Sequence, residues 1–281
     1  MQNGARLIGA GSPTGLLRPA MILAPGAAAA ASLNTQSAHF DGVDDKVTAA
    51  KTGLGASGSS YSIHAFFRLD TLPAAGQAYN FVAEQQATLN TKYPFTLRVN
   101  GDGNVRFELY DGTTWTAALD ASGLTTNTWY EVLGIRQHSN TTLYIYINRV
   151  QTASQTYTNA DYSNASATLL VGLDSSGSGE AWRLDGLLKD VRVFNVALNA
   201  TNIAFLTVAN IGKKPSEISG WDVANAANAN QLRHYNFESP WSNATVNDAS
   251  QVKDTGNDLS HATGVNLAGT ATSGVDTVVP S

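Results

Sequence analysis

Hydrophobic and polar residues alternate in one short run after another from residue 37 onward, and this period of two constrains the fold more than any other feature. Successive side chains of a β-strand point to opposite faces, so each run predicts a half-buried strand. Clusters of Gly, Asn, Asp and Ser separate the runs, as they do at turns. A parallel sheet would need crossover helices, which the sequence does not offer. We therefore predict an all-β fold, a sandwich of two antiparallel sheets packed face to face.

Two segments show these signals most clearly. Residues 143–148 alternate apolar and polar side chains without interruption. Residues 95–99 and 105–109 alternate in the same way on either side of Asn-Gly-Asp-Gly at 100–103, and such dipeptides accept the positive φ angles of tight turns, which predicts a hairpin. Helical spacing appears only briefly, after a candidate N-cap at Asn199. The helical content is therefore expected to be small.

The composition excludes several classes of protein. With 17 Lys+Arg against 22 Asp+Glu the net charge is −5, whereas nucleic-acid-binding proteins carry a basic face. The chain has no cysteine, which excludes disulfides, thiolate metal sites and cysteine nucleophiles. No apolar run approaches the roughly 18 residues that a membrane-spanning helix needs. Charged residues make up only 14% of the chain, so Ser, Thr, Asn and Gly must cover most of its surface.

Residues 1–36 differ from the rest of the chain, since they are rich in Ala, Gly and Pro. Such a segment cannot bury enough apolar surface to order itself, so another surface must hold it. We expect an N-terminal arm that docks on a neighbouring subunit. Two alternatives stay open: a secretory signal with Arg6 and Arg18 as its basic residues and cleavage at Ser32, or a loosely ordered tail.

Four short segments occur in an order that is typical of one family. Residues 38–47 contain Phe-Asp-Gly-Val-Asp-Asp. Residues 61–66 follow as a β-strand without a distinctive motif. Residues 127–132 contain a Trp-Tyr strand, and 184–195 contain Asp-Gly-x-x-x-Asp-Val-Arg-Val. Together these segments resemble the opening, middle and closing strands of laminin-G-like, concanavalin-A-like jelly-roll domains. The resemblance covers residues 37–207 and implies a jelly-roll sandwich there.

The first strand of that family has no counterpart before Phe40. It is usually of the type Trp-x-Phe-Asp/Glu, followed by an Asp-x-x-Gly-Asn turn, and similar residues stand here after the closing strand, at 234–238 and 254–258. We predict that residues 208–281 form a C-terminal extension that completes the sandwich in a circularly permuted order, which closely spaced chain termini permit. The alternative is the start of a second, truncated repeat.

The residues do not predict an enzyme. Retaining glycosidases need two carboxylates about 5 Å apart, which a Glu-x-Asp-x-Glu strand can supply. No glutamate lies in such a triplet, the 5 histidines show no metal-ligand spacing, and no Gly-x-Ser-x-Gly elbow or phosphate loop occurs. The glutamates are Glu84, Glu108, Glu131, Glu180, Glu217 and Glu238.

Calcium is the ion that best suits this sequence, because hard cations take carboxylate and carbonyl oxygens. The resemblance implies a calcium site where the first and last strands of the sandwich meet, with Asp190 and Glu238 as ligands. Asp41, Asp44 and Asp45 form a second candidate cluster. The alternative is that Asp41 belongs to a turn, with Asp44 and Asp45 in contact with solvent.

One turn combines an aromatic face with hydrogen-bonding groups. Proteins bind sugars by stacking an exposed aromatic ring on a pyranose face beside polar groups. Tyr110, Asp111 and Trp115 are therefore candidate carbohydrate-binding residues; the alternative is that these rings cover the sheet edge. Trp129 and Trp182 are expected in the core.

Two functions fit these observations. The first is a structural protein of a virus particle, a phage decoration, fibre or tail-associated protein that displays the jelly roll and contacts other virion proteins through residues 1–36. It would form a homo-oligomer, because edge strands and an arm invite pairing. The second is a secreted or surface bacterial lectin that binds cell-surface glycans. The missing cysteines, the polar surface and the arm favour the virion as its location. Neither function involves nucleic acid or a membrane.

Overall fold

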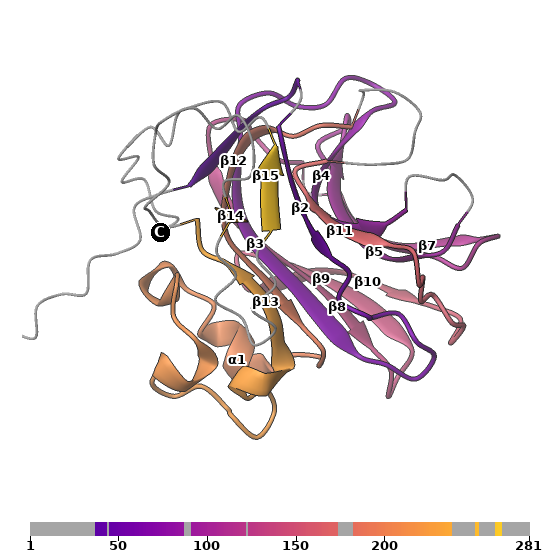
Figure 1. The fold of residues 1–281 in the computed structure, drawn as a ribbon, viewed down its shortest axis with the longest axis vertical. Helices are drawn as coiled ribbons and strands as arrows, with labels where there is room; N and C mark the ends of the chain where they lie inside the picture. The colour runs from indigo at the N-terminus through magenta and orange to yellow at the C-terminus, as the bar shows by residue number, and fades with distance from the viewer. Residues whose placement is uncertain are drawn as a thin grey trace, which may run out of the picture. The chain divides into compact units, whose positions relative to one another are not determined.

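Two antiparallel sheets pack face to face in this protein (Figure 1), which confirms the predicted all-β sandwich. A computed structural model describes residues 37–43, 45–86, 91–121, 123–173 and 182–237, and the backbone of 251–252 and 262–265. The predicted N-terminal arm lies outside the described residues. No helix within the described part of the chain is long and apolar enough to cross a membrane.

The first sheet has seven strands in the order β1-β12-β3-β8-β9-β10, with β13 also paired to β12. Its strands are β1 (Ala38–Asp41), β3 (Tyr61–Leu69), β8 (Trp129–Gln137), β9 (Thr142–Ile147), β10 (Val150–Thr156), β12 (Asp185–Phe194) and β13 (Gln231–Tyr235). β9 is the strand predicted from the uninterrupted alternation, and its start and end lie within one residue of that prediction.

The second sheet has eight strands in the order β14-β15-β2-β11-β4-β5-β6-β7. They are β2 (Lys46–Ala50), β4 (Ala78–Gln85), β5 (Tyr93–Asn100), β6 (Val105–Tyr110), β7 (Trp115–Asp120), β11 (Thr168–Val171), β14 (Gln251–Val252) and β15 (Ala262–Val265). β5 and β6 form the predicted hairpin, in which Leu97 pairs with Phe107 and Val99 with Val105.

Apolar side chains from alternate strand positions fill the space between the sheets, as the period of two predicts. Phe67 of β3 stacks on Phe81 of the other sheet, with 4.1 Å between ring centroids. Gly134 in β8 leaves room for a second aromatic ring, since a Cβ atom there would lie 2.4 Å from Cδ2 of Phe107. The sheets therefore interlock closely at the centre of the sandwich, which gives β5 and β6 a rigid backing.

The outer face of β8 and the end of β12 in the seven-stranded sheet are also buried, under a cover made by residues 196–226. Leu133 of β8 points outward and belongs to the same apolar cluster as Trp221 of the cover. The predicted helix cap is confirmed, because the side chain of Asn199 accepts a hydrogen bond from the backbone N–H of Asn202 at 3.0 Å. The short helices are α1 (Ala200–Ala204), η1 (Val208–Asn210), η2 (Pro215–Glu217) and, just after the cover, η3 (Asn228–Asn230).

Two strands from distant parts of the chain share one edge of β12. β1 pairs with residues 185–188 of β12 and β13 pairs with residues 191–194. The register shifts between these two halves, where Asp190 adopts a φ of 52°. β15 also pairs with β2, so the C-terminal segment adds strands to both sheets. The boundaries proposed at residues 37, 207 and 208 stay predictions.

Candidate functional site

An exposed tryptophan lies on a floor of buried tyrosines at the edge of the eight-stranded sheet. Trp115 begins β7 and pairs with Tyr110 of β6. Their rings stack with centroids 4.6 Å apart and planes at 24°, and Tyr93 of β5 lies 5.3 Å from the same indole. Both tyrosines are buried, whereas Trp115 is 45% exposed. The indole is therefore held in place from below and presents its other side outward.

Asp111 shapes the turn that leads into Trp115. Its Oδ1 atom accepts hydrogen bonds from the backbone N–H groups of Thr113 and Thr114, both at 2.8 Å, and from Thr113 Oγ1 at 2.7 Å. The hydrogen bonds from Thr113, followed by that from Thr114, lower the pKa of Asp111. Asp111 therefore fixes the approach of β7 to β6, and its role as a direct sugar ligand stays a prediction.

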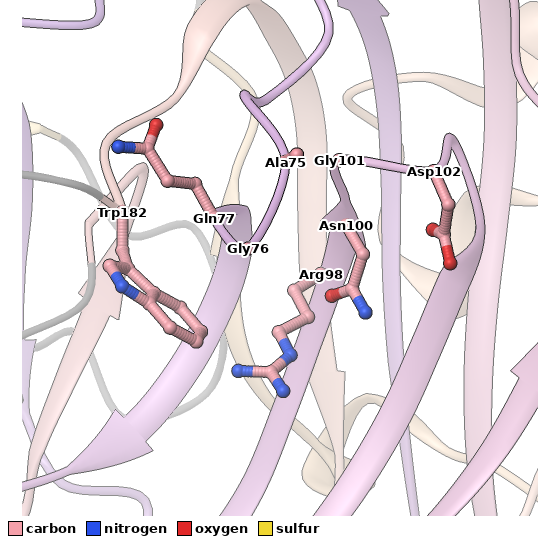
Figure 2. Close-up of a pocket in the computed structure, with 8 residues that line it drawn as sticks. All are labelled: Ala75, Gly76, Gln77, Arg98, Asn100, Gly101, Asp102 and Trp182. Atoms are coloured by element: carbon pink, nitrogen blue, oxygen red, sulfur yellow. The ribbon is translucent and has the colours of Figure 1, made fainter.

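A pocket of about 320 Å³ lies beside this aromatic group, between the outer face of β5 and the loop that precedes β4. Arg98 of β5 lines it together with Trp182, which follows β11 in the chain (Figure 2). The guanidinium carbon of Arg98 lies 4.7 Å from the Trp182 ring centroid and 5.9 Å from that of Trp115. The lining residues are Ala75, Gly76, Gln77, Arg98, Asn100, Gly101, Asp102 and Trp182.

The expectation that Trp129 and Trp182 lie in the core is half correct. Trp129 is buried, in a small cluster with Phe66 and Ile211 on the outer face of the seven-stranded sheet. Trp182 is only partly buried and lines the pocket, so its prediction was wrong. The alternation in β5 did contain a signal for the pocket, because inward Leu97 and its apolar neighbours place Arg98 and Asn100 on the outer face.

The polar floor beneath the pocket centres on one buried carboxylate. Glu108 of β6 pairs through Oε2 with Arg98 Nη2 at 2.7 Å and through Oε1 with Arg106 Nη1 at 3.5 Å. The Asn100 side-chain oxygen, with the amide oriented by its hydrogen bonds, accepts from Arg106 Nε at 2.6 Å and from Nη2 at 3.2 Å. Of the residues described around the pocket, Asp102 is the one carboxylate in its lining, whereas glycosidases use a pair.

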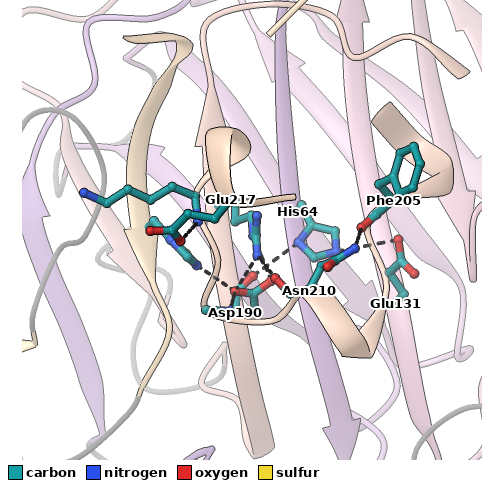
Figure 3. Close-up of polar contacts among 10 residues, drawn as sticks. His64, Glu131, Asp190, Phe205, Asn210 and Glu217 are labelled. Atoms are coloured by element: carbon teal, nitrogen blue, oxygen red, sulfur yellow. Dashed lines mark hydrogen bonds and ion pairs between the residues drawn. The ribbon is translucent and has the colours of Figure 1, made fainter. Parts of the chain in front are cut away.

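Asp190, expected from the resemblance to ligate calcium, belongs to a buried ion pair (Figure 3). Arg192 donates to it from Nε at 2.8 Å and from Nη2 at 3.1 Å, and His234 Nε2 lies 2.7 Å from its Oδ1. The backbone N–H of Gly212 donates to the same Oδ1 at 3.0 Å. Burial alone would raise the pKa of Asp190, but the charge of Arg192 and then the contact with His234 hold it well below its ordinary value. Protein donors therefore contact both carboxylate oxygens of Asp190, and calcium binding there stays a prediction.

The second calcium cluster is only partly described. The Asp41 Oδ1 atom accepts a hydrogen bond from the backbone N–H of Val43 at 2.8 Å, which is the turn geometry offered as the alternative to metal binding. Asp45 is buried and accepts from the backbone N–H of Asp41 at 2.8 Å. Asp44 and Glu238 lie outside the described residues. Calcium binding at these positions stays a prediction.

The structure brings together one group that the sequence did not predict. His39 of β1, Asp70 after β3 and Asp185 of β12 place one potential ligand atom each within 4.8 Å of one another. His39 Nε2 lies 3.1 Å from Asp70 Oδ2, and Arg68 Nη2 lies 3.1 Å from Asp70 Oδ1. Thr71 donates to Asp185. A small metal ion would have to replace these hydrogen bonds.

His234 gives the buried ion pair a pH dependence. Burial, and then the charge of Arg192, lower the pKa of His234 from its ordinary 6.5. His234 therefore takes up a proton near pH 6.5 in the unfolded chain but stays neutral at that pH in the folded chain. The stability that neutral His234 contributes is present above pH 6.5 and is lost as the pH falls below it. We expect the melting temperature to fall on acidification below that pH, and to fall less in His234→Gln, whose amide can still donate to Asp190.

The matched control is His39→Gln, which changes a partly exposed histidine.

Burial raises the pKa of Glu84 and of Glu131, so these two carboxyls favour the folded state at lower pH and oppose His234. Both contribute equally to wild type and variant, so the difference between the two melting curves isolates His234. Equal slopes in wild type and His234→Gln would contradict the assignment.

Comparison with known proteins establishes the family. The model of the concanavalin A-like lectin/glucanases superfamily matches residues 41–204, which is more than half of the chain. The chain therefore belongs to this superfamily. A search of curated protein sequences found no match.

Solved structures share the fold at low sequence identity. A Bacteroides ovatus protein, named for a proposed carbohydrate-binding role, matches with a TM-score of 0.55 and 17% identity over 82% of this chain and 57% of its own. A mutant NanB sialidase from Streptococcus pneumoniae matches with a TM-score of 0.51 and 13% identity over 63% of this chain and 28% of its own. The CBM40 module of a Ruminococcus gnavus sialidase reaches 0.47 at 13% identity, over 60% and 97% of the two chains. The first two likenesses show a common fold, and this chain spans 57% and 28% of those proteins.

Proposed function

We propose that this protein binds glycans without hydrolysing them, through the outer face of β5, β6 and β7. The observation that carries the proposal is the Trp115 indole, exposed on one side and stacked on Tyr110 on the other, next to the pocket at Arg98 and Trp182. The carbohydrate-binding role for which the Bacteroides ovatus protein is named is in keeping with it.

The chemistry of the surface suits a sugar. A pyranose ring has an apolar face of C–H groups and an equatorial rim of hydroxyls. The indole of Trp115 can cover the apolar face, while the side chains of Gln77 and Asn100 and the carboxylate of Asp102 offer donors and acceptors for the rim. Because Tyr93 and Tyr110 already hold the indole in place, binding would cost little side-chain entropy.

Trp115→Ala is expected to weaken glycan binding at least about tenfold, because the stacking surface is lost. The fold should be retained, since Trp115 is half exposed and outside the main core. Binding would be screened on a glycan array and quantified by calorimetry. The matched control is Val150→Ala, which removes another exposed apolar residue, at 64%, from β10 of the other sheet. The proposal would be refuted if the wild-type protein bound no glycan on the array, or if wild type and Trp115→Ala bound a glycan with equal affinity.

We further propose that the glycan-binding domain is displayed on a virus particle, as a phage decoration, fibre or tail-associated protein. The Ala- and Gly-rich residues 1–36 would then anchor it to other virion proteins, and the edge strands β7 and β10 would support a homo-oligomer. A secreted or surface bacterial lectin explains the fold equally well. Intact mass of the native protein separates the two, because a retained Met1 segment excludes export by cleavage. Light scattering that shows a monomer with the segment intact would count against the virion role.

A further inference from the structure

The pocket beside Trp115 contains more positive than negative charge at its floor. Arg98 and Arg106 both pair with Glu108, which is the one carboxylate partner of Arg98 among the described residues. Arg106 is also satisfied by Asn100, whereas Nε of Arg98 is buried and has no hydrogen-bond acceptor in the described structure. Two guanidinium charges therefore share one carboxylate, and of these two arginines it is Arg98 that lines the pocket.

The surroundings of Arg98 make that charge available to a ligand. Its guanidinium lies between the rings of Trp182 and Trp115, at 4.7 and 5.9 Å from their centroids. Aromatic walls displace water and lower the local dielectric constant, so an anion placed there is attracted more strongly than at an open surface. A carboxylate suits this position because it is planar and charged, as the guanidinium is.

The acidic residue of the pocket does not cancel this charge. Figure 2 shows Asp102 and Trp182 on opposite sides, with Arg98 between them. Asp102 belongs to the turn between β5 and β6, where its Oδ1 accepts a hydrogen bond from the backbone N–H of Asn104 at 3.0 Å. It is placed to accept hydrogen bonds from sugar hydroxyls at the other end of the pocket.

We infer that the glycan bound by this surface carries a carboxylate, and that Arg98 pairs with it while a sugar ring stacks on the neighbouring indoles. This inference rests on the proposed glycan-binding function and names its ligand class, an acidic sugar such as a uronic or sialic acid. The aromatic centroids lie within about 11 Å of each other, by the two distances measured from Arg98, which is a span that a short oligosaccharide covers.

The test uses pairs of glycans that differ only in charge. An array would carry uronic-acid and sialic-acid oligosaccharides, each beside its methyl ester and beside a neutral analogue. The acid is expected to bind at least about tenfold more tightly than its ester, because a charge-assisted hydrogen bond is lost on esterification, and added salt should reduce the difference. Equal binding of acid and ester, or binding of neutral glycans alone, would overturn this inference and leave the proposed function intact. No binding to any glycan would refute both.

Variants of the residues at the floor of the pocket test which side chain recognises the carboxylate of the glycan. Arg98→Gln should remove the preference for the acid, and Arg106→Gln should leave most of it. Glu108→Gln should strengthen binding of the acid several-fold, since it frees Arg98 from its competing carboxylate, and this gain cannot result from misfolding. An unchanged preference in Arg98→Gln, or weaker binding of the acid in Glu108→Gln, would show that another group recognises the charge.

Discussion

Asp190→Asn is expected to lower the free energy of unfolding by about 3–5 kcal/mol, the usual cost of removing one partner of a buried ion pair. Asparagine is the informative replacement, because it tolerates the positive φ of 52° at this position and keeps the size of the side chain. The Arg192 guanidinium would then remain buried without its counter-charge. Urea unfolding followed by tryptophan fluorescence measures the change.

The effect should spread to the cover of the seven-stranded sheet. Arg192 Nη2 donates to the backbone oxygen of Asn210 at 2.7 Å, and the Gly212 N–H donates to Asp190, so the ion pair ties the end of η1 to β12. The control is Asp161→Ala, which removes an exposed partner of Lys92 and should cost no more than about 1 kcal/mol. If Asp190→Asn behaved like this exposed control, the buried ion pair would not stabilise the fold.

Arg136→Ala is expected to destabilise the protein by a similar amount, about 3–5 kcal/mol, as other large buried side chains do when truncated. Arg136 is 0% exposed, and no described carboxylate pairs with it. Its guanidinium instead lies 5.5, 4.9 and 5.2 Å from the ring centroids of Tyr61, Tyr157 and Tyr162. It also joins three chain segments, by donating to the backbone oxygens of residues 56 and 160 and to the side chain of residue 59.

Arg136→Met separates packing from polar contacts. Methionine fills much of the space but donates no hydrogen bond, so it should recover part of the loss and leave the cost of the unsatisfied acceptors. Lys92→Ala serves as the control for removing a partly exposed cation. The change in the free energy of unfolding would be measured by urea unfolding. A decrease below about 1 kcal/mol for Arg136→Ala, with an unchanged m-value, would mean that contacts of Arg136 with the three tyrosines do not stabilise the fold.

The strands could be predicted from the sequence because apolar and polar residues alternate within a half-buried strand, and this alternation is visible in the sequence itself. The hairpin of β5 and β6 and the cap at Asn199 could also be predicted, because each is determined by residues that are close together in the sequence. The rest of the cover, residues 205–226, could not be predicted, because its short 3-10 helices and irregular connections have no repeating period.

The candidate site was predicted only where it is local. Trp115 and Tyr110 meet across one turn, so the sequence brought them together. Trp182 reaches the pocket through the connection between β11 and β12, and pairing of Arg98 with that indole depends on the packing of segments distant in sequence. The expected calcium ligand Asp190 illustrates the same limit, because His234, which lies 44 residues away, contacts it only in the folded sheet.

The shared edge of β12 has a consequence for how the protein is made on the ribosome. Residues 185–188 can pair with β1 as soon as they emerge, because β1 was synthesised long before. Residues 191–194 must wait until 231–235 have left the exit tunnel. During that interval one edge of residues 191–194 lacks its strand partner, and another nascent chain could pair with it. Pairing along this edge of β12 is therefore complete only after β13 has been synthesised, and until then the open edge is available to another chain.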